Sequence, residues 1–95
     1  MFIASFDIGE KNFAYCIAKY YDDQLNILKI AHHNVIRKKT QTVTESCVHI
    51  SSIMRNDSQL MKCDHFVIEQ QMLCNTRAQR LGQHVWSTLY TLSPE

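Results

Sequence analysis

Two acidic residues stand directly after apolar runs, where carboxylates can bind a divalent metal ion. Asp7 follows the run 2–6, and Glu69 follows the run 66–68. An unpaired charge in a buried strand is costly, which indicates a metal ligand, although Asp7 can also be a turn residue that bonds the backbone beside Gly9. If the runs are parallel neighbours about 4.8 Å apart, both carboxylates reach one ion or a close pair, and such sites cleave phosphodiesters. The alternative is two unrelated acids in solvent.

The residues around the first acid could assist such chemistry. Gly9 lacks a Cβ atom, so the turn that it forms can bring backbone amides close to a phosphate or a hydrated metal. Ser5 and Asn12 could orient the acid or a metal-bound water, but their positions are explained somewhat better by a small strand residue and a turn residue. Lys11 could steady a phosphate or pair with Glu10.

Further candidates for contact with a nucleic acid are basic or polar. They are Arg37, Lys38, Lys39, Gln70, Gln71, Asn75, Arg77 and Arg80. The basic run 37–39 suits a phosphate contact but is also typical of a solvated loop. Arg77 and Arg80 fall in the first turns of a predicted helix, where a cation opposes the helix dipole, and this favours a phosphate partner.

Length and composition limit the class of protein. Ninety-five residues with 45% apolar side chains predict one domain with a modest core. The net charge of +1 means that any nucleic-acid binding has to rest on local patches. The four cysteines form no C-x-x-C pair, so we expect small buried side chains in a reducing compartment rather than a zinc site or disulfides. We find no signal peptide and no apolar run near the roughly 18 residues of a membrane span, and we expect an intracellular protein.

The pattern of apolar residues predicts a mixed α/β fold. Residues 2–8, 12–21 and 25–36 read as strands joined by short polar turns, which favours an antiparallel meander. Both faces of the first strand are largely apolar before the acid, which suits a central strand covered on both sides.

Two helices and a fourth strand complete the pattern. Thr42 and Glu45 fit a capping box at the start of a helix that frays near 56–58. A fourth strand at 65–70 follows and, after a long crossover, is expected to lie parallel to an earlier strand. The last helix, 76–92, can be capped by Asn75, and Gly82 on its apolar stripe could allow close helix contact. That stripe comprises Ala78, Leu81, Val85, Leu89 and Leu92.

The two acidic motifs and the segment after the second resemble the Holliday junction resolvases of poxviruses and iridoviruses, relatives of the RuvC-type resolvases. The motifs are Phe6-Asp7-Ile8-Gly9-x-Lys11-Asn12-x-Ala14 and Val67-Ile68-Glu69-Gln70-Gln71, followed by the stretch 72–85. The resemblance covers nearly the whole chain. It implies an RNase H-like fold with strand order 3-2-1-4-5, and a role in DNA recombination, repair and viral genome processing.

The resemblance also implies the chemistry and the partners. Members use magnesium, with manganese as an alternative, to cut four-way DNA junctions, usually as homodimers. Asp7 and Glu69 would be the first two metal ligands, and a metal-activated water would attack the DNA phosphate. The last helix would help to form the dimer, with Leu81, Val85 and Leu89 packing across subunits. A viral source would place the protein in the host cytoplasm or nucleus.

The family pattern contains parts that these 95 residues do not match. It adds a fifth strand, a basic catalytic residue and a C-terminal helix with two more acids, so we expect the N-terminal portion of a resolvase fold, with a second polypeptide as one source of the other acids. Two alternatives stay open. One is a non-catalytic fragment that binds DNA or dimerises. The other is an actin-like ATPase or sugar-kinase domain, disfavoured because Gly9 and Gly82 are the only glycines.

Overall fold

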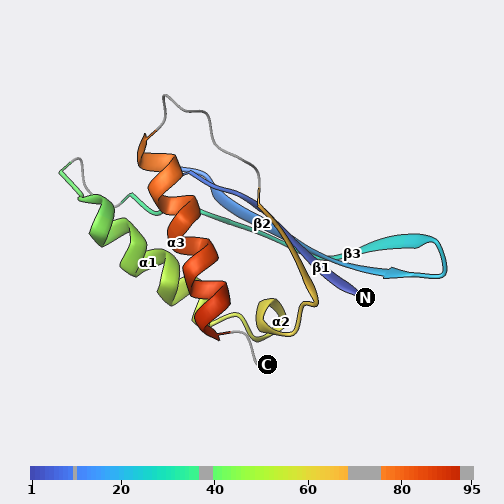
Figure 1. The fold of residues 1–95 in the computed structure, drawn as a ribbon. Coiled ribbons are helices and arrows are strands. Elements are labelled where there is room, and N and C mark those ends of the chain that lie inside the picture. The colour runs from blue at the N-terminus through green and yellow to red at the C-terminus, as the bar shows by residue number, and fades with distance from the viewer. Residues whose placement is uncertain (10, 37–39, 69–75, 93–95) are drawn as a thin grey trace.

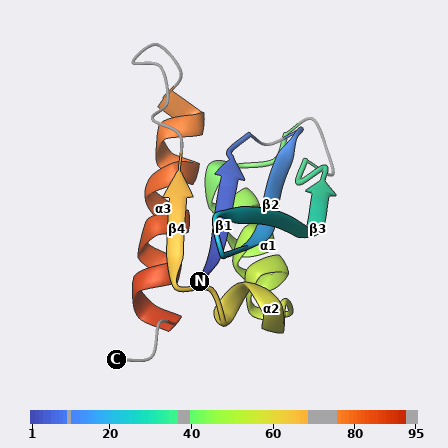
Figure 2. The same ribbon diagram turned by 90° about the vertical axis from the view of Figure 1, so that its right-hand side faces the viewer.

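The computed structural model describes residues 1–9, 11–36, 40–68 and 76–92. Within them the strands β1 to β4 form one sheet in the order β3-β2-β1-β4, seen from its open side in Figure 2. The pairs β1/β2 and β2/β3 are antiparallel, and β4 lies parallel to β1, which confirms the predicted meander and crossover. The strands are β1 (Phe2–Asp7), β2 (Phe13–Tyr21), β3 (Gln24–His33) and β4 (His65–Ile68).

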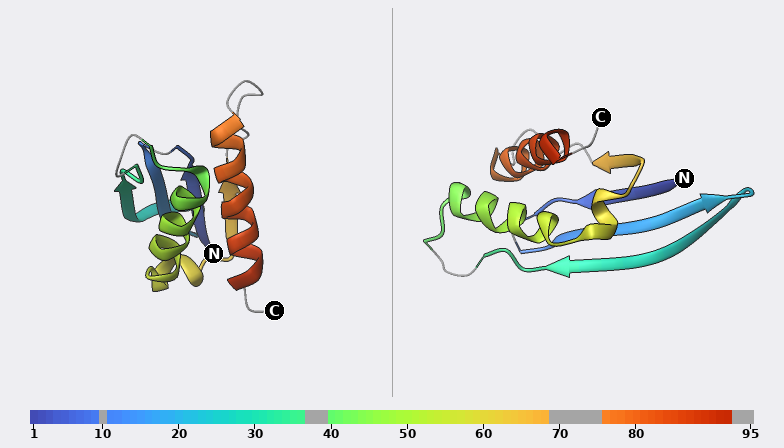
Figure 3. Two further views of the ribbon diagram at one scale, coloured as in Figure 1. Left: turned by 90° about the vertical axis from the view of Figure 1, so that its left-hand side faces the viewer. Right: turned by 90° about the horizontal axis from the view of Figure 1, so that it is seen from below.

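The β2–β3 hairpin turns at two aspartates. Asp22 and Asp23 have φ angles of 55° and 59°, and two positive angles at the centre of a two-residue loop suit the twist of a hairpin. The hairpin projects beyond the helices in Figures 1 and 3. β3 ends at His33, three residues before the predicted end, because its partner strand begins at Phe13, which pairs with His33. Beyond the strand, Val35 is fully buried.

The helices α1 (Val43–Arg55) and α3 (Thr76–Leu92) cover one face of the sheet, with the short α2 (Ser58–Met61) beside α1 (Figures 1 and 3). Alternate residues of β1 and β2 point into the core between these layers. There they join side chains from α1, α2 and α3, with partly buried neighbours from β4. The main buried apolar residues are Ala4, Phe6, Ile8, Phe13, Tyr15, Ile17, Ile50, Met54, Leu60, Leu81, Val85 and Leu89.

The other face of the sheet is not covered by any helix of the described residues. Ser5 and Asp7 on that face of β1 are exposed, and so are Ile30 of β3 and Val67 of β4. The expectation of a central strand covered on both sides is therefore not met within the described part of the chain. The apolar residues of β1 that suggested it, apart from Ile3, face the helices.

The break between α1 and α2 has a local cause. Thr42 and Glu45 form the predicted capping box, and α1 then runs to Arg55. Instead of fraying, the chain begins a new helix: Asp57 accepts hydrogen bonds from the backbone N–H groups of Gln59 and Leu60 and so caps α2.

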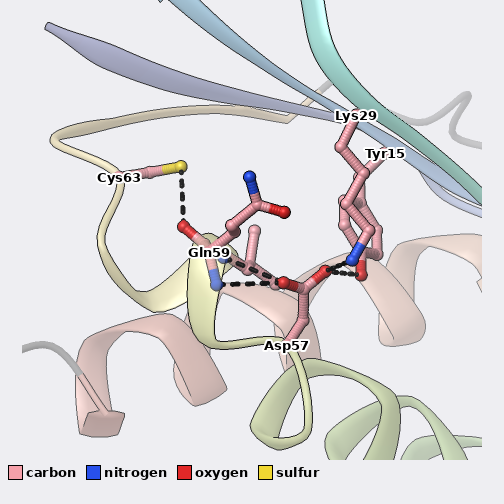
Figure 4. A network of polar contacts seen from close by, with 6 residues as sticks. Tyr15, Lys29, Asp57, Gln59 and Cys63 are labelled. Carbon is pink, nitrogen blue, oxygen red and sulfur yellow. Dashed lines mark hydrogen bonds and ion pairs between the residues drawn. The ribbon is translucent and has the colours of Figure 1, made fainter.

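Asp57 also ties this turn to the sheet, as Figure 4 shows. Its Oδ2 accepts a short hydrogen bond from the Tyr15 hydroxyl of β2. The same oxygen forms an ion pair with Lys29 Nζ of β3 at 2.8 Å. Burial of the Asp57 carboxyl would raise its pKa, but the bonds from Lys29, Tyr15 and the Leu60 N–H outweigh burial and lower the pKa below its usual value. Burial and the contact with Asp57 raise the pKa of Tyr15.

Two smaller predictions concern cysteines and membranes. Cys16 and Cys63 are free thiols, Cys47 is half-buried as they are, and Cys74 lies outside the described residues. Burial, followed by the nearby carboxylates of Asp64 and Asp57, raises the pKa of Cys63. Among the described helices, none combines the length and the apolar character needed to cross a bilayer.

Candidate metal and nucleic-acid site

Asp7 ends β1 at the carboxyl edge of the parallel strand pair. Its side chain is exposed, and its backbone pairs with Ala14 of β2. On the other side of β1, Phe6 is in parallel register with Ile68, the last described residue of β4. Glu69 comes next in the sequence but lies outside the described residues. The two strands are therefore parallel neighbours, and their register can be followed to the residue that precedes each acid.

A shallow hollow of about 520 Å³ lies on the open face of the sheet beside Asp7. Four residues in register across the sheet form part of its floor, namely Val67, Ser5, Cys16 and Ile30. Among the described residues that line it, Asp7 is the acidic one, and it stands beside a largely apolar floor.

The polar neighbour of Asp7 across β2 is His32, which the pattern of the sequence did not single out. Ala14 pairs with Asp7 on one side and with His32 on the other, so the three share one row of the sheet. His32 Nε2 donates a hydrogen bond to Asn12 Oδ1 at 2.9 Å. Asn12, predicted to orient the acid or a metal-bound water, thus has its side-chain oxygen bonded to His32. The sequence signal was the alternation that places His32 on the open face of β3.

Both long helices begin at the Asp7 end of the sheet. β3 and β4 run in the direction of β1, so α1 must return from the end of β3 to the start of β4, and α3 must return from the end of β4. Figure 1 shows the two helices running side by side in the same direction. Helix N-termini carry partial positive charge, so this edge of the molecule suits an anion such as phosphate.

Three of the remaining predicted nucleic-acid contacts, Lys11, Arg77 and Arg80, lie in the described part of the chain. Lys11 is exposed in the β1–β2 turn. Arg77 donates a hydrogen bond to the Gln41 carbonyl at 3.3 Å, which links the start of α3 to the segment before α1. Arg80, exposed one turn further along α3, lines a groove between α3 and α1. The other predicted contacts, namely Arg37, Lys38, Lys39, Gln70, Gln71 and Asn75, lie outside the described residues.

The predicted dimer patch is corrected by the structure. Leu81 and Val85 are fully buried and Leu89 nearly so, and all three belong to the core between α3, α1 and the sheet. Their spacing along α3 defines its inner face, so they are not exposed for a second subunit to contact. Gly82 does not mediate a close helix contact either, because a Cβ atom built on it would meet no atom within 4 Å.

The metal ligands that the described residues offer around Asp7 can be compared with the ligands that magnesium prefers. This ion takes hard oxygen ligands, keeps several waters and usually binds one or two protein carboxylates together with phosphate oxygens. Asp7 offers an exposed carboxylate that fits this role. In the part of the chain that the structure describes, no three His, Cys, Asp or Glu side chains cluster closely enough to hold a metal ion by themselves. Asp7 therefore fits a site completed by ligands from outside the described residues.

Comparison with known proteins gives one family and one fold relative. A family model described as "Poxvirus A22 protein" matches residues 1–93. A solved structure described as a structural study of the Aquifex aeolicus PPX-GPPA enzyme shares 16% identity with a TM-score of 0.60. The alignment covers 97% of this chain and 33% of that one, so the chain spans about a third of its length, and the likeness concerns the fold alone. No curated protein matches the chain.

Proposed function

The chain belongs to the poxvirus A22 protein family, a family of Holliday junction resolvases, and on this premise we propose that it is a metal-dependent nuclease acting on four-way DNA junctions. The observation that carries the proposal is the position of Asp7. It ends a strand that lies parallel to β4, and the register runs through the pair Phe6 and Ile68. The next residue in each strand sequence is an acid, Asp7 in one and Glu69 in the other.

In this proposal Asp7 and Glu69 hold magnesium, or manganese in its place. When bound, the ion would supply charge stabilisation for phosphodiester cleavage and lower the pKa of a water molecule. Asp7, exposed at the end of β1, would be one of the carboxylates that hold it. Lys11 in the following turn favours the negatively charged backbone at the same edge, and so does the N-terminus of α3, whose first turn contains no acidic residue.

We test this with a labelled four-way junction and the purified 95-residue chain in magnesium and in manganese. The variants are Asp7→Asn and Glu69→Gln, which remove the charge and keep the shape. Asp22→Asn is the matched control, because Asp22 is an exposed carboxylate in the hairpin turn and asparagine also tolerates its positive φ of 55°. We expect symmetric nicks from the wild type and the control, and a loss of at least about a hundredfold in both site variants.

Three outcomes separate the alternatives. Cleavage that persists in Asp7→Asn would contradict the proposed role of that carboxylate. Junction binding without cleavage in every form would favour a non-catalytic module, or one that needs further acids. For that case we propose that a second polypeptide can supply them, and adding such a polypeptide should restore nicking. If the chain neither binds nor cleaves the junction, the proposed function is overturned.

We further propose that the protein forms a homodimer through α3, by a different face of the helix from the one first predicted. The exposed aromatic side chains of α3 are Trp86, 54% exposed, and Tyr90, 87% exposed. They are four residues apart and therefore neighbours on one helix face. Aromatic side chains of this kind commonly contribute much of the binding energy of an interface.

A further inference from the structure

A second hollow, lined by both polar and apolar side chains, lies on the helical layer away from Asp7. A groove of about 760 Å³ runs between α1 and α3, and no strand residue lines it. A smaller hollow of about 170 Å³ continues it and shares Ser51, Arg55 and His84 with it. The two helices lie side by side in Figures 1 and 3. Because Asp7 lines the open face of the sheet, the groove is a separate site.

The charged side chains among the described residues of the groove are cations. Its ionisable cations are Arg55 of α1 and Arg80 of α3, and His84 of α3 lies between the helices. The hydroxyl groups of Thr44, Ser51 and Ser52 and the amide of Asn56 complete its polar surface, beside the apolar side chains of Val43, Cys47 and Val48. Thr88 lines the smaller hollow. Among the described residues, neither hollow is lined by an aspartate or a glutamate. A surface with arginines and hydroxyl donors but no carboxylate is complementary to an anion with several oxygens, such as phosphate.

The centre of the groove is held by a contact between the helices. Ser51 Oγ and His84 Nε2 are 2.6 Å apart, and Thr88 Oγ1 lies 3.4 Å from the same nitrogen. Arg55 follows Ser51 by four residues on α1, and Arg80 precedes His84 by four residues on α3. Four residues span about 6 Å of helix, and the helices run in the same direction, so the two arginines lie on opposite sides of the central pair. They are therefore placed to contact separate phosphates along one strand.

We propose that this groove binds the phosphodiester backbone of DNA, at a strand or arm of the junction other than the one at Asp7. The choice of DNA as the source of the phosphate rests on the proposed function. The net charge of the chain is +1, so attraction to DNA has to come from local clusters, and this groove is such a cluster. A junction presents several strands at once, which allows contact with both layers of the molecule.

The first experiment uses inorganic phosphate as the probe, so that it does not depend on DNA binding. Phosphate is titrated into the 15N-labelled chain, and amide and histidine signals are followed by NMR. We expect saturable shifts at Ser51, Arg55, Arg80 and His84, and their loss in the double variant Arg55→Gln/Arg80→Gln. Lys62→Gln is the matched control, because Lys62 is an exposed cation outside the groove. Shifts spread evenly over the surface would overturn the site.

The second experiment measures junction affinity against salt, with fluorescently labelled DNA and an Asp7→Asn background that prevents cleavage. Each lost phosphate contact flattens the slope of log K against log salt by about 0.9. When salt rises from about 50 to about 200 mM, the affinity of the double variant should therefore fall by a factor about ten times smaller than that of the parent. The Lys62→Gln control should keep the parent slope.

The two experiments distinguish the failures. Phosphate shifts in the groove with an unchanged salt slope would overturn DNA as the occupant and leave a site for free phosphate. No junction binding by any form would overturn the proposed function, and with it DNA as the occupant, while the NMR titration still decides whether the groove binds phosphate.

Discussion

The buried carboxylate of Asp57 connects three parts of the chain that are distant in sequence. It caps α2 through two backbone N–H groups and accepts bonds from Tyr15 and Lys29 on neighbouring strands. The side chain of Asp57 is 6% exposed and that of Lys29 is 38% exposed, so one partner is buried and the other partly hydrated. Solvent therefore screens part of the attraction, and the stabilisation is less than that of a fully buried pair.

Replacing Asp57 with asparagine should destabilise the fold. Asparagine can keep the cap with its side-chain oxygen but loses the charge that Lys29 and Tyr15 contact. We expect the free energy of unfolding to fall by about 1–3 kcal/mol, measured by urea denaturation. Asp22→Asn, at an exposed position, should change it by less than about 0.5 kcal/mol. An Asp57→Asn variant as stable as the wild type would contradict the role assigned to the network.

The pH dependence of the difference in unfolding free energy between wild type and Asp57→Asn distinguishes the contribution of the Asp57 charge from that of packing. The folded pKa of Asp57 is lowered, so its charge contributes stability that is fully present above the unfolded pKa of about 3.9 and is lost as pH falls through the folded pKa. The gap in unfolding free energy between wild type and Asp57→Asn should thus be constant above about pH 5 and shrink below about pH 4. A gap that stays constant in acid would indicate lost packing alone.

The sequence predicted some of these residues and missed others for physical reasons. Asp7 could be found because it follows an apolar run, which is a local signal. Asp57 was assigned to a fraying turn, because its partners Tyr15 and Lys29 are 42 and 28 residues away and no local pattern indicates them. His32 was missed for the same reason, since its position relative to Asp7 depends on the register of two strand pairs.

At the scale of elements, α3 contains a position that weakens it. Gly82 is buried, yet a Cβ atom there would have no neighbour within 4 Å. Glycine costs about 0.5–1 kcal/mol relative to alanine inside a helix, so Gly82→Ala should raise the free energy of unfolding by about that amount. Thermal or urea unfolding measures the change. Ala78→Gly, on the same buried face, is the reciprocal variant and should lower stability; a destabilised Gly82→Ala would show that the space is needed.

Local signals located the elements better than they located their ends. The capping box of Thr42 and Glu45 set the start of α1, and the apolar period set α3, because these patterns act within one turn. The end of β3 depends on where β2 begins, which is a tertiary property. Local patterns also could not predict that one face of the sheet is exposed, because burial of that face depends on another layer that packs on it.

At the scale of the whole molecule, the two layers present different chemistry. The open sheet face carries Asp7 above an apolar floor, which suits a cation bound by carboxylates. The helical layer carries the cationic groove between α1 and α3, which suits a phosphate. The groove extends to Arg55 at the C-terminal end of α1, so the proposed phosphate contacts and the proposed metal site lie on different faces of the molecule. A resolvase has to hold several strands while cutting one, and this separation is consistent with that task.

Trp86 and Tyr90 are exposed on α3, whereas Leu81, Val85 and Leu89 of the same helix are buried in the core. The two aromatic side chains are therefore the ones available for contact with a second subunit. If α3 forms the dimer, sedimentation at micromolar concentration should show a dimer for the wild type, and Trp86→Ser/Tyr90→Ser should weaken it at least tenfold, since buried aromatic residues at interfaces commonly contribute more than about 1–2 kcal/mol each. Tyr21→Ser is the matched control, because Tyr21 is 71% exposed on the hairpin instead. A monomeric wild type, or equal dissociation of all variants, would contradict this interface. Circular dichroism should be unchanged, since neither aromatic side chain belongs to the core.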